Sequence, residues 1–167
     1  MLGGAISQSI YYVPNIKGGA NTVTVQFNQS AASPDIRILE YSGLATSAPL
    51  DVTATATGSS TAANSGSAST TSAGELIFGA NTVYTGTRSA GTGFTSRTIT
   101  SDGDIAEDED VSASGSYSAS ATLSSAGNWV MQMAGGPPFE VCAKGGRRSG
   151  TLSGGSYLQL NPREATR

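Results

Sequence analysis

Small or apolar residues alternate with polar ones along most of this chain, with the two-residue period of a β-strand. The longest example runs from Val111 to Leu123, where every second residue carries a hydroxyl group. No segment shows the 3.6-residue spacing of an amphipathic helix. The pattern therefore predicts an all-β protein.

Eight segments carry the alternation, and residues that favour turns separate them. Many short strands of this kind favour two packed antiparallel sheets, so we expect a β-sandwich of jelly-roll type. Residues 57–74 are nearly all small or hydroxylated and are expected to form a flexible loop or a weak surface strand. The expected strands are Ser7–Val13, Thr22–Phe27, Asp35–Tyr41, Leu50–Thr57, Glu75–Tyr84, Phe94–Thr100, Val111–Leu123 and Asn128–Met133.

The alternation stops at residue 136, which divides the chain into a sandwich domain (1–135) and an irregular extension (136–167) containing glycine and arginine. Within the extension, Tyr157–Leu160 is expected to add one edge strand. The domain has 4 basic and 10 acidic residues, and the extension has 5 basic and 2 acidic. An acidic body argues against nucleic acid as a partner, because lysine and arginine must neutralise the phosphates.

The composition excludes several kinds of site. The chain has no histidine, so it cannot build a Ser-His-Asp triad, and its one cysteine, Cys142, cannot form an intramolecular disulfide. No apolar run is long enough for a membrane span, and no signal peptide is visible in this chain. Low charge with abundant Ser, Thr and Gly is typical of extracellular β-proteins, so we expect a secreted or cell-surface location.

Residues 5–134 contain a series of motifs that resemble, in order, a domain of large secreted proteins of environmental bacteria. The motifs are SQSIYYVPNI, ANTVTVQF, DIRILEYSGL, DVTATATG, ELIFGAN, GTGFTSRTITSDGDIAEDEDV and GSYSASATLSSAGNWVMQMA. The resemblance implies a jelly-roll sandwich beside other β-modules. It implies no activity and no catalytic residues, because none is established for the family.

This chain departs from that family in three ways. The family has additional strands before SQSIYY whereas this sequence begins almost on that motif, its tail from Gly136 looks foreign, and Glu109 stands where the family usually has a basic residue. A sandwich that lacks early strands exposes a sheet edge. We therefore expect either the C-terminal tail or a second copy of the chain to fill the gap.

An acidic cluster spans residues 102–110, and one reading is a calcium site, because calcium prefers oxygen ligands. The alternative is a solvated acidic strand edge that discourages aggregation. An EF-hand is excluded, because Ala106 occupies the fifth position of the loop. The candidate ligands are Asp102, Asp104, Glu107 and Asp108.

Carboxyl groups could also catalyse glycoside hydrolysis, which needs an acid and a base or nucleophile but no histidine. Glu40 shares one strand face with Ile36 and Ile38, and Arg37 shares the other face with Leu39 and Tyr41. In a regular strand, either Glu40 or Arg37 therefore points inward. If Glu40 is inward, Glu107 or Asp108 could be its partner. No Glu-x-Asp-x-Glu pattern of the β-jelly-roll glucanases is present.

Tyrosines are the best candidates for stacking on sugar rings. Tyr11 and Tyr12 are adjacent, so one of them must face outward in a regular strand, and Tyr84 lies near a loop. Tyr117 and Trp129 occupy core positions of the alternation. The sequence therefore favours a non-catalytic binding or adhesion module, with a polysaccharide or cell-surface glycan as partner. The alternatives are a carboxylate-dependent glycoside hydrolase and a structural repeat that self-associates.

Overall fold

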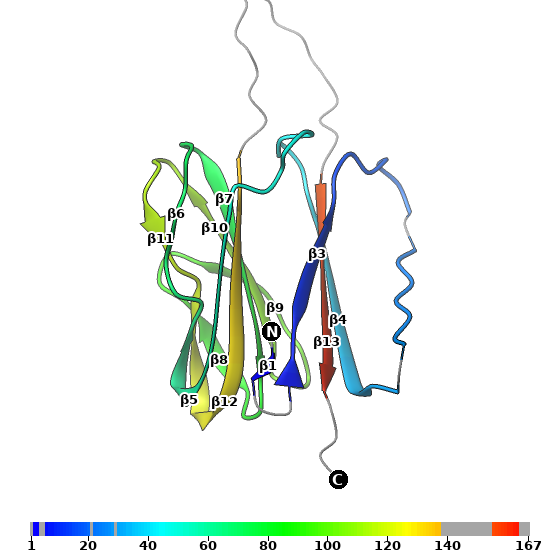
Figure 1. Ribbon diagram of the computed structural model, residues 1–167, viewed down its shortest axis with the longest axis vertical. Helices are drawn as coiled ribbons and strands as arrows, with labels where there is room; N and C mark the ends of the chain where they lie inside the picture. Colours follow the sequence, from blue (N-terminus) through cyan, green and yellow to red (C-terminus); the bar gives the residue numbers. More distant parts are fainter. Residues whose placement is uncertain (1, 4–5, 21, 29, 138–154, 164–167) are drawn as a thin grey trace, which may run out of the picture.

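The structure, a computed structural model, describes residues 2–3, 6–20, 22–28, 30–137 and 155–163. The described chain forms thirteen strands and no helix, and every paired strand is antiparallel (Figure 1). A larger sheet and a smaller sheet pack face to face, which confirms the expected all-β sandwich.

The main sheet has the strand order β5-β12-β7-β10-β9, and β8 pairs with β12. A separate two-stranded antiparallel sheet, β6 (Ala68–Ser69) and β11 (Ser116–Tyr117), lies beside it. The main-sheet strands are β5 (Val52–Asn64), β7 (Glu75–Val83), β8 (Thr87–Ala90), β9 (Thr95–Ile99), β10 (Ile105–Val111) and β12 (Ser120–Gly136).

The small sheet is completed by the C-terminal strand. That strand pairs with β3 on one side and β4 on the other, so it lies inside the sheet and not at the expected edge (Figure 1). The C-terminal tail thus fills a gap in this sheet. This is the first of the two expected alternatives, the other being a second copy of the chain. The strands are β1 (Leu2–Gly3), β2 (Ile6–Ser7), β3 (Ser9–Val13), β4 (Ala32–Tyr41) and β13 (Gly155–Arg163).

The core lies on both faces of β7, and every residue of that strand is buried. Ile77 faces one apolar cluster, which contains Trp129, and Tyr117 packs against its margin. Phe78 faces a second cluster, against which the small sheet packs Leu39 and Tyr41. The core positions of Trp129 and Tyr117 are as the alternation predicts.

Buried polar side chains also join the two sheets. Gln8 donates from Nε2 to the carbonyl oxygen of Ala80 at 2.8 Å. Arg37 donates from Nη1 to Ile105 O at 2.6 Å and from Nη2 to Asn81 O at 2.9 Å. A buried guanidinium group is stable only when its N–H groups have hydrogen-bond acceptors such as these. Arg37 is 3% exposed, so the arginine face of β4 points inward and Glu40 is exposed with the isoleucines.

Two strand predictions are wrong in detail. Residues 22–27 form no strand, and the described strand that pairs with β4 is β13. The expected long strand at 111–123 is interrupted at residues 112–115, where the chain bends and its side chains are mostly exposed rather than packed in the core. Of the two alternatives expected for residues 57–74, the surface strand is found as far as Asn64, because backbone pairing with β12 extends β5 despite its small side chains.

Candidate functional site

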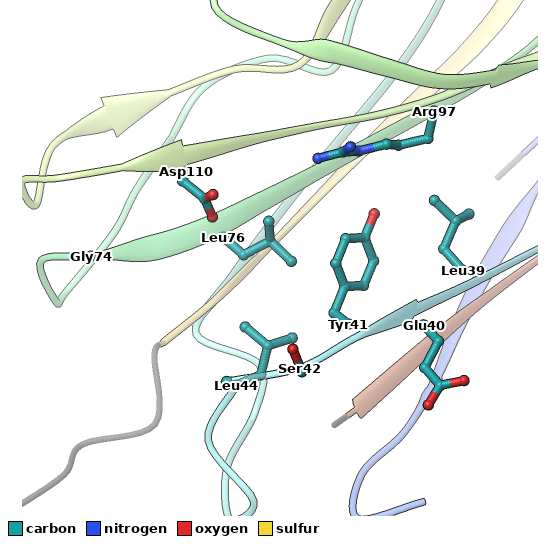
Figure 2. A pocket seen from close by; sticks show the side chains of 10 residues that line it. Leu39, Glu40, Tyr41, Ser42, Leu44, Gly74, Leu76, Arg97 and Asp110 are labelled. Carbon is teal, nitrogen blue, oxygen red and sulfur yellow. The ribbon is translucent and has the colours of Figure 1, made fainter. Parts of the chain in front are cut away.

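A cavity of about 540 Å³ opens between β4 and the strands β7, β9 and β10 (Figure 2). Small-ligand sites commonly have volumes of roughly 300–1,000 Å³, so the cavity is large enough for one. Three leucines form its apolar wall, and five polar residues line it beside them. The leucines are Leu39, Leu44 and Leu76, and the polar residues are Glu40, Tyr41, Ser42, Arg97 and Asp110.

Strand alternation explains how the polar residues meet. On β10, Asp108 and Asp110 share the face that points toward the small sheet, and on β4 Leu39 and Tyr41 point back toward them. Arg97 comes from a β-bulge in β9, because Thr98 pairs with Ala106 and Ser96 with Glu107, which leaves Arg97 as the extra residue. A bulge redirects a side chain, and here it aims the guanidinium at Asp108.

Asp108 is the centre of the network. Arg97 donates to it through Nε and Nη2, both at 2.7 Å, and the Tyr41 hydroxyl donates to Oδ2 at 2.7 Å. The Asp108 side chain is 3% exposed, whereas that of Arg97 is 47% exposed. Hydrogen bonding to Asp108 raises the pKa of Arg97 above its usual value, so the guanidinium stays charged.

Two polar groups at the cavity keep unused hydrogen-bonding capacity. Nη1 of Arg97 makes no hydrogen bond with the described part of the chain, and neither does the exposed carboxylate of Asp110. The guanidinium lies between the Tyr41 hydroxyl and Asp110 at the top of Figure 2, with Leu76 and Leu44 below. The cavity thus offers a donor, an acceptor and an apolar wall together.

The acidic cluster is not a solvated edge, because β10 lies between β7 and β9 in the main sheet. Asp104, Glu107 and Asp108 are buried, and only Asp102 of the four candidate ligands is exposed. Asp104 accepts from Val83 N at 2.8 Å, while Glu107 and Asp108 point to opposite faces of β10. Among the described residues, no three acidic or cysteine side chains are grouped to hold a metal ion. Calcium binding stays a prediction.

Glu107 lies on the face of β10 away from the cavity. Oε2 accepts from Gly91 N at 3.0 Å, while Oε1 is buried without a hydrogen-bond partner. Burial raises the pKa of Glu107 to about 7. Because Asp108 lies across the strand in an ion pair, the two neighbouring carboxyl groups cannot act on the same substrate atom.

A second pair of carboxyl groups, Asp51 and Glu75, lies at the turn before β7. Asp51 accepts from the backbone and hydroxyl of Thr71, both at 2.7 Å, and these bonds lower its pKa. Burial raises the pKa of Glu75, which accepts from Ser72 N at 3.0 Å. Both groups hold the turn before β7, and neither lines the cavity.

The candidate sugar-stacking tyrosines do not meet at the cavity. Tyr11, Tyr12 and Tyr84 are 53%, 42% and 47% exposed, and the first two lie on β3 while Tyr84 follows β7. Glu40 borders the cavity, but its carboxylate points away from the Tyr41 hydroxyl (Figure 2). Cys142 lies outside the described residues.

Sequence reasoning missed Arg97 and Asp110 as partners in one site. The shared face of Asp108 and Asp110 is visible in the alternation, but the bulge that brings Arg97 to them leaves no local signature. Comparisons with protein-family models, curated proteins and solved structures find no match to this chain. Over the described residues, there is no helix of sufficient length and hydropathy to cross a membrane.

Proposed function

We propose that this protein is a non-catalytic carbohydrate-binding module and that the cavity beside Arg97 is its binding site. The supporting observation is the combination of the Arg97 donor and the Asp110 acceptor with a wall of leucines. A sugar ring presents both hydroxyl groups and an apolar C–H surface, and such a lining complements both. A glycan partner fits a secreted or cell-surface protein.

Binding fits the cavity better than hydrolysis does. Both oxygens of Asp108 already accept hydrogen bonds, so this carboxylate is engaged as a structural partner of Arg97. Glu40 is directed away from the cavity interior. Glycoside hydrolysis needs two carboxyl groups on either side of one bond, and these residues do not present that arrangement.

The test begins with a glycan array and continues with calorimetry on the glycan that is retained. We expect Asp110→Asn to weaken binding about tenfold, because hydrogen bonds to a charged group contribute about 1.5–3 kcal/mol. Glu109→Gln is the matched control, since it removes the same charge from the neighbouring residue on the other face of β10.

Three outcomes would contradict the proposal. One is that no glycan is retained, and another is that reducing sugar is released. The third is that Asp110→Asn binds normally while Tyr11→Ala, Tyr12→Ala or Tyr84→Ala loses binding, which would move the site to the exposed tyrosines. Thermal unfolding with calcium and with EDTA tests the predicted metal, and a calcium-dependent rise in midpoint would place a site in the folded state.

A further inference from the structure

β5 is an edge strand with an unoccupied side. It pairs with β12, and no described residue forms a strand ladder on its other side. In an antiparallel ladder, alternate residues direct their N–H and C=O groups away from the neighbouring strand. The outer side of β5 therefore presents a row of backbone donors and acceptors. Its odd-numbered side chains are exposed on one face of the sheet: Thr53, Thr55, Thr57, Ser59 and Thr61.

Two other edge strands, β9 and β4, carry features that hinder pairing, and a third, β3, is only five residues long. β9, at the opposite end of the main sheet, is five residues long and is interrupted by the Arg97 bulge. β4, at an edge of the small sheet, carries Pro34 and Glu40 among its charged and rigid residues. Charges, prolines and bulges are the usual protection of a sheet edge.

β5 carries no charge and no proline among its thirteen residues. Its ladder with β12 is regular from Val52 to Ser60, and the register shift lies beyond Ser60. A long, regular edge of this kind is a template for another strand. Unlike β4 and β9, β5 can therefore accept a further strand along the regular part of its edge.

We propose that β5 pairs with β5 of a second copy of this chain, antiparallel, to form one continuous sheet through a dimer. A two-fold axis perpendicular to the sheet keeps equivalent faces on the same side, so odd-numbered residues oppose odd-numbered residues. The exposed hydroxyl residues, such as Thr55 and Thr57, then face one another, and such cross-strand pairs are favourable. Self-pairing brings no like charges together, because the strand has none.

This interface leaves the proposed binding site open. Arg97 lies on β9, and β9 and β5 are at opposite ends of the strand order in the main sheet. The dimer therefore carries two accessible cavities. The proposal does not depend on what the cavity binds.

Light scattering of the full chain tests the dimer. We expect the unmodified protein to have twice its chain mass of 16.7 kDa. Thr55→Lys/Thr57→Lys and Thr55→Glu/Thr57→Glu should each be monomeric, because like charges would meet across the two-fold axis. An equimolar mixture of these two variants should restore the dimer. Ser112→Lys/Ser114→Lys is the control, since it adds the same charge at exposed bends away from the edge.

A monomeric unmodified protein at its highest soluble concentration would overturn the proposal. So would a dimer that survives both charged variants, which would place the contact on another surface. Amide hydrogen exchange gives an answer that does not require the variants to fold. We expect exchange in β5 to slow as protein concentration rises, while exchange in β9 stays constant, and equal behaviour of the two strands would refute the interface.

Discussion

Glu107 and Asp108 are sequence neighbours, yet the fold gives their carboxyl groups opposite environments. Asp108 has Arg97 and Tyr41 as hydrogen-bond donors, whereas Glu107 accepts from the backbone of Gly91 and has one buried oxygen without a hydrogen-bond partner. A carboxylate buried without a cation is destabilised relative to its protonated form. Glu107 therefore takes up a proton on folding near neutral pH.

The protonation of Glu107 makes stability depend on pH. Its pKa rises from 4.5 to about 7 on folding, so the folded state holds the proton more tightly between those values. The stabilisation is complete below pH 4.5 and is lost as the pH rises through 7. We expect a loss of about 3 kcal/mol across this interval relative to Glu107→Gln, measured by urea unfolding at several pH values. Parallel pH profiles for the two proteins would contradict this assignment.

At the scale of strands, buried polar side chains connect β4 to the main sheet. Arg37 reaches the carbonyl oxygens of Asn81 and Ile105, and its Nε lies 3.6 Å from Asp35 Oδ2. The apolar residues beside it, Ile36 and Ile38, are 42% and 54% exposed. The usual preference for burying isoleucine is overridden here, because Arg37 faces the main sheet and finds carbonyl acceptors there on β7 and β10.

Replacing that donor should loosen the contact between the sheets. We expect Arg37→Met to lower the free energy of unfolding by about 3 kcal/mol, because two buried carbonyl groups and Asp35 lose a charged partner. Arg88→Met, which removes an exposed arginine on β8, should change it by less than about 0.5 kcal/mol. The measurement is chemical denaturation, and equal effects of the two substitutions would show that the Arg37 contacts do not stabilise the fold.

At the scale of the whole molecule, the alternation predicted the class of fold and most strands, because it records which side chains face the core. Glu75–Val83 is an example, although burial on both faces makes it part of two clusters. The alternation could not predict strand order, which depends on distant segments such as β13. It also could not predict the cavity, because the Arg97 bulge and the inward face of β4 are decided by tertiary contacts.

Removal of the C-terminal strand tests the arrangement of the small sheet. A chain that ends at Pro137 lacks β13, so β3 and β4 lose their shared neighbour. We expect a lower unfolding midpoint and loss of the cavity, because β4 supplies Leu39 and Tyr41 to it. Circular dichroism and glycan binding measure the two effects. An unchanged midpoint would mean that β13 does not contribute to the folded sheet.

The position of β13 also has a consequence for biosynthesis. Strands β5 to β12 follow one another along the chain and can pair as they leave the ribosome, whereas β3 and β4 are made early and must wait for a strand made last within this sequence. Non-local pairing of this kind is slow and leaves strand edges open in the meantime. The inward face of the nascent β4 would be uncovered during that interval. We therefore expect this half of the molecule to be the part that depends on chaperones during translation.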